Sequence, residues 1–238
     1  MSPLPLGPPT VATLIAQIVA LLPGGLPTSL TAASHGADAY EGYGFALAVA
    51  AANDVGLAVT YEPRNGPAFV PSAASPITLR TTPSHITTGN FTHAVLALNG
   101  VPSFEVHTGI YVRGTSHAQH ECDVVLLRRS GGVAARAAMP PPGLPRAADV
   151  IWALEAKFYN GANVGIDIGR EYLGLNADVG GGSSRRTSLY VTRCRPSVRR
   201  LLAHHGRVGT LFAGVGPTTT AEANLRSHLR GVLEKAIA

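Results

Sequence analysis

The segment Ala37–Asn53 limits the possible folds of this chain more than any other feature, because almost all of its side chains are apolar, aromatic or absent. Between Asp38 and Asp54 the only polar exceptions are Glu41 and Asn53. A helix that is apolar all round has no face for water, so we expect this helix to be buried. The chain has 238 residues, of which 45% are hydrophobic and 14% charged, so it is long enough to form a core around the helix.

The second half of the chain alternates between strand and helix patterns, which favours an α/β fold with a central mixed sheet flanked by helices. We expect a helical extension over residues 1–30 and one α/β domain over residues 31–238. Five prolines between Tyr61 and Asn90 indicate loops there, and a Gly/Pro-rich connection covers Ser130–Ala148. The expected strands are Phe104–Arg113, Glu121–Arg128, Val150–Phe158, Ser188–Arg193 and Thr210–Val215, and the later helices are Ile166–Asp178, Pro196–His205 and Ala221–Ala238.

The apolar segment Val11–Leu22 follows Thr10, a good helix cap, and is too short to cross a membrane. Its apolar stripe can pack on the core of its own chain or on a second subunit. The two cysteines are too few for a disulfide framework, which is typical of a reduced, cytoplasmic protein. A net charge of +5 is compatible with a polyanionic partner.

The segment Ile151–Phe158 carries two charges in an otherwise apolar strand. Side chains alternate across a strand, so Glu155 and Lys157 lie on one face, and Trp152, Leu154 and Ala156 lie on the other. Unpaired charges in such a strand would each cost several kcal/mol. A salt bridge or a strand edge open to water would also account for them. However, only two of the 19 cationic residues are lysines, so a lysine here favours a specific need for an ammonium group.

Two further acids occur in apolar surroundings, Asp123 in the strand Glu121–Arg128 and Glu41 in the buried helix. The strands of Asp123 and Glu155 are joined by one connection, so they can be antiparallel neighbours that bring the two carboxylates together. Two adjacent carboxylates repel one another unless a cation lies between them.

The order of Glu41 on a helix, Asp123 on a strand, Glu155-Ala156-Lys157 on the next strand and then a helix resembles the PD-(D/E)xK nuclease superfamily. The resemblance covers about residues 38–215. It implies a restriction-endonuclease-like core and a Mg²⁺-dependent endonuclease that cuts DNA, in restriction, anti-phage defence or repair. Cys122 stands before Asp123, where the family pattern has proline.

The resemblance also implies roles for these residues. Asp123, Glu155 and the carbonyl of Ala156 would hold Mg²⁺, for which Mn²⁺ can substitute, and Glu41 would bind through water or hold a second ion. Lys157 would orient or deprotonate the attacking water. The partner would be nucleic acid, double-stranded DNA above all, and both strands are most simply cut by two sites related by a two-fold axis, so we expect a homodimer or a multiple of dimers.

Substrate contacts are expected from Arg170 and Tyr172 at the start of the next helix, and from Arg185 and Arg186 in a basic loop. A solvated helix face and a soluble surface are the alternatives. Two other functions remain open. One is a catalytically silent protein of the same fold that binds nucleic acid or serves in an assembly, and the other is an RNase.

Overall fold

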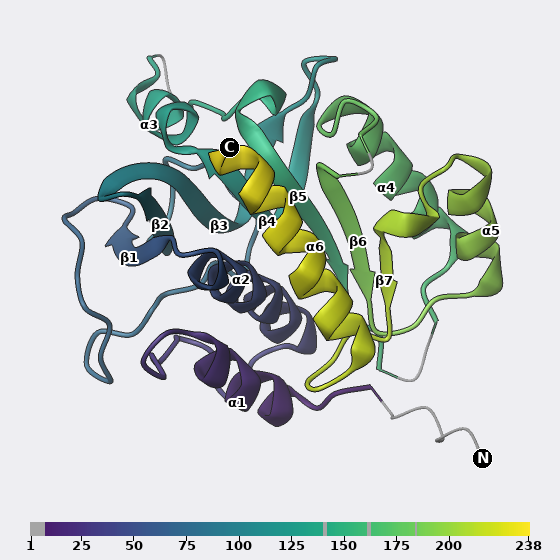
Figure 1. Cartoon of the computed structure of the whole chain (residues 1–238), viewed down its shortest axis with the longest axis horizontal. Coiled ribbons are helices and arrows are strands. Elements are labelled where there is room, and N and C mark those ends of the chain that lie inside the picture. The colour runs from purple at the N-terminus through teal and green to yellow at the C-terminus, as the bar shows by residue number, and fades with distance from the viewer. Residues whose placement is uncertain (1–7, 140–141, 161–162, 184) are drawn as a thin grey trace.

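The computed structural model describes residues 8–139, 142–160, 163–183 and 185–238. Within these residues seven strands form one sheet, in which the spatial order of the strands is their order along the chain (Figure 1). Neighbours from β1 to β5 are antiparallel, and β5, β6 and β7 are parallel. The expected α/β class with a mixed sheet is therefore confirmed. The strands are β1 (Ala58–Pro63), β2 (Thr92–Leu98), β3 (Val101–Arg113), β4 (Gln119–Arg128), β5 (Val150–Lys157), β6 (Thr187–Val191) and β7 (Leu211–Ala213).

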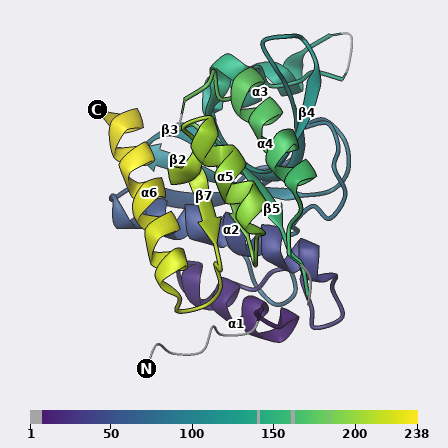
Figure 2. The same ribbon diagram turned by 90° about the vertical axis from the view of Figure 1, so that its right-hand side faces the viewer.

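Helices cover both faces of the sheet, and in Figure 2 the sheet separates α6 from α4. One face packs on α2 and α6, with α1 outside α2, while α3, α4 and α5 lie with the opposite face. No helix among the described residues is long and apolar enough to span a membrane. The helices are α1 (Val11–Leu21), α2 (Gly36–Asp54), α3 (Arg129–Ala137), α4 (Ile166–Asp178), α5 (Pro196–His204) and α6 (Thr220–Ile237), with 3₁₀ turns η1 (Ala147–Asp149) and η2 (Val208–Thr210).

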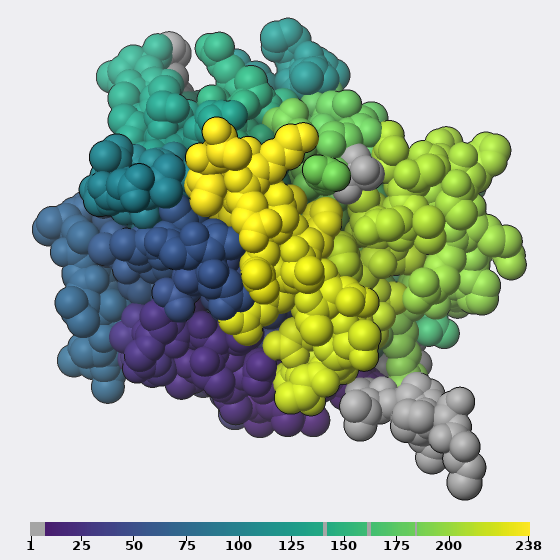
Figure 3. Space-filling view, viewed as in Figure 1, coloured from purple at the N-terminus to yellow at the C-terminus, as the bar shows by residue number. Residues whose placement is uncertain are grey.

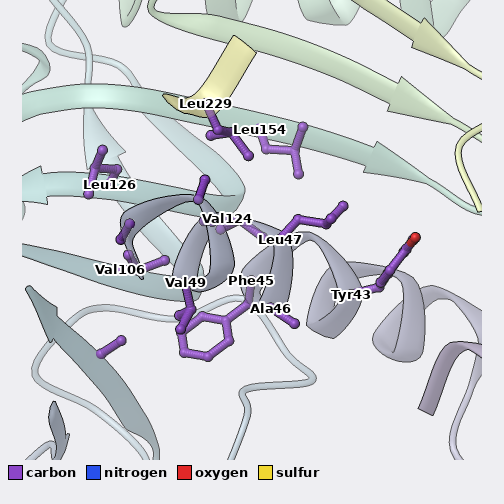
Figure 4. Packing of buried hydrophobic residues seen from close by; sticks show 14 of the residues in the cluster. Tyr43, Phe45, Ala46, Leu47, Val49, Val106, Val124, Leu126, Leu154 and Leu229 are labelled. Atoms are coloured by element: carbon purple, nitrogen blue, oxygen red, sulfur yellow. The ribbon is translucent and has the colours of Figure 1, made fainter. Parts of the chain in front are cut away.

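Helix α2 is the buried helix that the sequence predicts, since every residue from Tyr43 to Ala52 is buried. Its side chains pack between the sheet, α1 and α6 (Figure 4). Gly44 faces the sheet, where an added Cβ would lie 2.7 Å from a methyl carbon of Leu154 and 3.3 Å from one of Val124. The missing side chain therefore allows α2 to approach β4 and β5 closely, at the strands that carry Asp123 and Glu155.

Helix α1 belongs to the same core as α2. Its capping residue is the expected one, because the hydroxyl of Thr10 accepts a hydrogen bond from the N–H of Thr13 at 3.2 Å. Leu14, Ile18 and Leu22 are at most 1% exposed and join the main hydrophobic cluster. The apolar stripe could pack on its own chain or on a second subunit, and in the structure it packs on its own chain.

The sequence missed three elements. Strands β1 and β2 were not expected, because they flank the Pro-rich segment between them and β1 itself ends at Pro63. Helix α3 lies in the connection predicted as a loop, where Gly131 and Gly132 argue against a helix. The structure explains these glycines, because a Cβ on Gly132 would collide with the carboxylate of Glu105 beneath the helix.

Candidate active site

Strands β4 and β5 bring the two predicted carboxylates to the same place. They pair antiparallel, with Val124 opposite Leu154 and Val125 opposite Ala153, so the register continues toward Asp123 and Glu155. This arrangement confirms the expected antiparallel neighbours. The other face of β5, opposite Glu155 and Lys157, is also as expected, because the side chains of Trp152, Leu154 and Ala156 are in the main core.

Lys157 joins the two acids. Its Nζ lies 2.6 Å from Oε1 of Glu155 and 3.5 Å from Oδ2 of Asp123. The N–H of Ala156 donates a hydrogen bond of 2.6 Å to the same Oδ2 of Asp123. The side chains are 2% exposed for Asp123, 13% for Glu155 and 26% for Lys157, so the group opens toward solvent at the ammonium. A ligand can therefore reach the Lys157 ammonium from solvent.

Aromatic contacts of α2 position Glu41. The ring of the preceding residue, Tyr40, stacks on Tyr190 with centroids 3.9 Å apart and lies 5.5 Å from Phe158, just beyond the end of β5. The hydroxyl of Tyr190 also donates to the carbonyl of Tyr40 at 2.6 Å. These contacts fix the first turns of α2 over the ends of β5 and β6, beside the Lys157 ammonium.

The acids outnumber the cations in this group. Burial, reinforced by the charges of Asp123 and Glu121, raises the pKa of Glu41 to about 9. Burial and the charge of Asp123 raise the pKa of Glu155 to about 7. Burial alone would lower the pKa of Lys157, but Asp123 and Glu155 outweigh it and raise that pKa. These shifts show that the carboxylates are destabilised by burial and by one another, and a cation bound among them would relieve that repulsion in place of protons.

Glu121 is a member of this group that the sequence did not single out. It lies two residues before Asp123 on β4. Burial and the charge of Asp123 raise the pKa of Glu121, and the charge of Glu121 in turn contributes to the raised pKa of Glu41. The spacing of Glu121 and Asp123 in the sequence could have revealed it, because residues at i and i+2 of a strand share a face. Glu121 is exposed, so it adds negative charge at the opening of the site.

The residues present fit a hard divalent cation such as Mg²⁺. Carboxylate and carbonyl oxygens are its usual protein ligands, and it keeps water in its other positions. Within a strand the N–H and C=O of one residue point to the same neighbour, so the carbonyl of Ala156 lies on the edge of β5 that faces β4 and Asp123. Asp123, Glu155, Glu41 and this carbonyl would hold the ion.

A second group of ligand-type side chains occurs on β2 and β3. The potential donor atoms of His93, Glu105 and His107 all lie within 4.8 Å of one another, and the three residues are buried. In the described part of the chain, this is the one group of three or more His, Cys, Asp or Glu residues that meets this distance limit. The acids around Lys157 are more widely spaced, with the ammonium between two of them.

Charge balance distinguishes the two groups. Glu105 is fully buried and binds Arg136 through two hydrogen bonds of 2.8 and 2.5 Å. Arg129 donates to Glu105 and to Glu62, at 3.1 Å in each case. Two arginines thus neutralise two carboxylates, and a divalent cation here would add unbalanced charge to the interior. We therefore interpret this group as a buried ion-pair cluster, and keep the group around Lys157 as the candidate cation site.

The residues predicted to bind substrate lie in different surroundings. Tyr172 is fully buried, and its hydroxyl donates to the carbonyl of Thr187 at 3.0 Å, so it belongs to the core and not to a substrate surface. The alternative, a solvated helix face, does not hold for Tyr172 either, because its side chain is buried. Arg170 is 66% exposed and pairs with Asp167 at 3.2 Å, one turn away on α4.

Arg185 and Arg186 lie beside the start of β5, at the opposite end of the strand from Lys157. Two carbonyls, of Ala147 and Val150, each accept a 2.5 Å hydrogen bond from Nη2 of Arg186. Val150 begins β5 and Lys157 ends it. The strand has eight residues, and the seven steps of ~3.3 Å between the first and the last place its two ends roughly 23 Å apart. These arginines therefore do not contact a phosphate held at the Lys157 end.

Comparisons with known proteins add no relative: no family model matches the chain, and neither the curated proteins nor the solved structures include a significant match to it.

Proposed function

We propose that this protein is a Mg²⁺-dependent endonuclease that hydrolyses phosphodiester bonds of DNA. The observation that carries the proposal is the meeting of Asp123, Glu155 and Lys157 where β5 ends beside the middle of its antiparallel neighbour β4, with Glu41 near them on α2. This is the constellation that the resemblance to the PD-(D/E)xK superfamily implies. The succession α2, β3, β4, β5, α4, β6 supports it, because the acids and the lysine occur on the elements where the resemblance expects them.

The chemistry of the side chains fits phosphodiester hydrolysis. A divalent ion stabilises the negative charge of the transition state and lowers the pKa of a bound water. Asp123 is held by the N–H of Ala156, so its carboxylate is oriented before any ligand arrives. Lys157 is the most exposed of the three groups, and its ammonium can orient a water or offset charge on the phosphate. Its raised pKa favours this cationic role over that of a base.

The test is cleavage of supercoiled plasmid and of RNA by the purified protein, with Mg²⁺, with Mn²⁺ and with excess EDTA. We expect metal-dependent cleavage of the plasmid and none in EDTA. Asp123→Asn and Glu155→Gln should remove activity, because each takes one charged oxygen ligand from the site while keeping its shape. Glu234→Gln is the matched control, since Glu234 is exposed on α6.

Each contrary result has a defined meaning. Cleavage that persists in EDTA or in both variants would exclude the metal mechanism. Cleavage of RNA alone would assign an RNase with the same site chemistry. Binding of DNA without any cleavage would favour a catalytically silent member of this fold.

A further inference from the structure

A cavity lies at the end of β5 opposite to the candidate active site. Its accessible volume is about 390 Å³. It is open to solvent and is lined by the C-terminal turns of α6, the start of β5 and the segment before β6, and Figure 3 shows the end of α6 beside that segment. Its lining residues are Arg128, Ala148, Val150, Ile151, Ser183, Arg185, Arg186, Val232, Lys235 and Ala236.

The charges around this cavity have one sign. Four of its lining residues are cationic, and no lining residue is acidic. Arg128, Arg185 and Lys235 are exposed, and none of the three makes an ion pair with another residue that the structure describes. Like charges gathered without a counter-ion repel one another, so an anion bound among them relieves that repulsion.

One of the four cations is fixed in place. Arg186 is held through Nη2 by the carbonyls of Ala147 and Val150. Burial and the nearby charge of Arg128 lower the pKa of Arg186, which agrees with a crowded cationic wall. A fixed guanidinium binds an oxyanion with little loss of conformational entropy, because its side chain is already ordered.

The rest of the wall is apolar. Val150 and Val232 are buried, and Ile151 and Ala236 are half-buried beside them. A cavity of this size that combines a few charged groups with apolar side chains suits a small organic molecule better than a bare ion. The ligand therefore has both an anionic group and a less polar part.

This cavity is separate from the candidate active site. The two lie at opposite ends of a strand roughly 23 Å long. A phosphate under cleavage at Lys157 cannot also occupy the cavity.

We propose that this cavity binds a small organic phosphate ester, of the size of a nucleoside monophosphate. The phosphate lies against the fixed guanidinium of Arg186 and among the exposed cations Arg128, Arg185 and Lys235, where arginine can form paired hydrogen bonds to its oxygens. The less polar part lies on Val150, Ile151 and Val232. The proposal does not depend on nuclease activity.

The test is calorimetric titration of the full chain with four probes: adenosine monophosphate, inorganic phosphate, adenosine and a short-chain phosphatidic acid below its micelle concentration. We expect adenosine monophosphate to bind at least about tenfold more tightly than inorganic phosphate or adenosine, since each lacks one half of the ligand. Tighter binding of the phosphatidic acid would identify a lipid headgroup as the source of the phosphate ester. No binding of either ester at millimolar concentration would overturn the proposal.

Variants assign the binding to this cavity. Arg185→Ala/Lys235→Ala should weaken adenosine monophosphate binding at least about tenfold, because two charge-assisted contacts are lost. Arg200→Ala/Arg230→Ala removes the same charge from exposed positions on α5 and α6 and should change the affinity less than about twofold. Equal weakening in both variants, or none in the first, would overturn the proposal. All four residues are exposed, so neither variant is expected to unfold the protein.

Discussion

Lys157 occupies a space that fits an ammonium group. Its Nζ lies between two carboxylates at 2.6 and 3.5 Å, and a planar guanidinium at the end of a longer side chain cannot take the same position. We therefore expect Lys157→Arg to lower the rate of plasmid cleavage at least about a hundredfold, or about 2.7 kcal/mol of transition-state free energy. Single-turnover cleavage rates with Lys235→Arg as the control measure this effect. Near-normal rates in a folded Lys157→Arg protein would make the lysine a structural counter-ion.

His93 makes the stability of the protein depend on pH. It is 2% exposed, its ring stacks on His107 with centroids 4.6 Å apart, and Glu62 and Glu105 lie 3.6 and 3.8 Å from its Nε2. Burial, with the neighbouring His107, lowers the pKa of His93 to about 2, despite the opposing charge of Glu105. The folded protein therefore holds this ring neutral, whereas the unfolded chain takes up a proton near pH 6.5.

It follows that the contribution of His93 to stability is complete above pH 6.5 and is lost as the pH falls below it, because the unfolded state then binds the additional proton. Replacing His93 with glutamine removes this titration. We expect His93→Gln to reduce the slope of unfolding free energy against pH by about 1.4 kcal/mol per pH unit between pH 6 and 4. Urea unfolding at several pH values, followed by Trp152 fluorescence, measures the slope. Parallel curves for the two proteins would contradict a neutral buried His93.

Sequence reasoning found the acids and the lysine of the candidate site because each stands out in an apolar strand or helix. It missed the cluster around Glu105, although Glu105 and His107 show the same alternate spacing as Glu155 and Lys157. The two clusters differ in which elements supply the residues that surround the charged pair. Arg129 and Arg136 come from α3, and His93 from β2, and neither element was expected from its local sequence.

At the scale of elements, α2 was predicted correctly because a helix that is buried on all sides has an apolar or small residue at almost every position. Helix α3 was unpredictable for the opposite reason. Its two glycines disfavour a helix locally, and contacts with Glu105 and Asp149 that come from distant parts of the chain override that preference. Strand β1 was also unpredictable from its local sequence. The segment ends in proline, and it forms a strand through its pairing with β2.

The packing of α1 gives a prediction for that helix. Ile18 is fully buried against the core, so Ile18→Asp would place a charge where it has no partner. We expect this change to lower the free energy of unfolding by at least about 3 kcal/mol, or to prevent folding. Ala16→Asp is the control, because Ala16 is exposed on the same helix, and it should cost less than about 1 kcal/mol. Denaturant unfolding compares them. A folded, stable Ile18→Asp protein would mean that α1 does not pack as described.

At the scale of the molecule, one candidate site per chain bears on how duplex DNA would be cut. Two sites related by a two-fold axis can cut both strands of an antiparallel duplex in one binding event, so the proposed nuclease is expected to act as a dimer. The buried stripe of α1 is not available for that contact, because Leu14, Ile18 and Leu22 are already covered. Light scattering and plasmid cleavage at the same concentration test the prediction. A monomer that linearises plasmid without accumulating nicked circles would refute it.

The strand order also determines how the chain can find its fold. Because each strand pairs with the next one along the chain, the sheet can grow by successive additions, each closing a short or moderate loop. Helix α6 is the exception. It packs on α2, and the ion pair of Arg226 with Asp54 joins residues 172 positions apart. Closing so long a loop has a larger entropic cost than pairing strands that follow one another along the chain, so α6 should dock after the sheet has formed. Until it docks, the apolar surface of α2 that it covers is open to other chains. The interval between sheet formation and α6 docking is therefore when this protein is most exposed to aggregation.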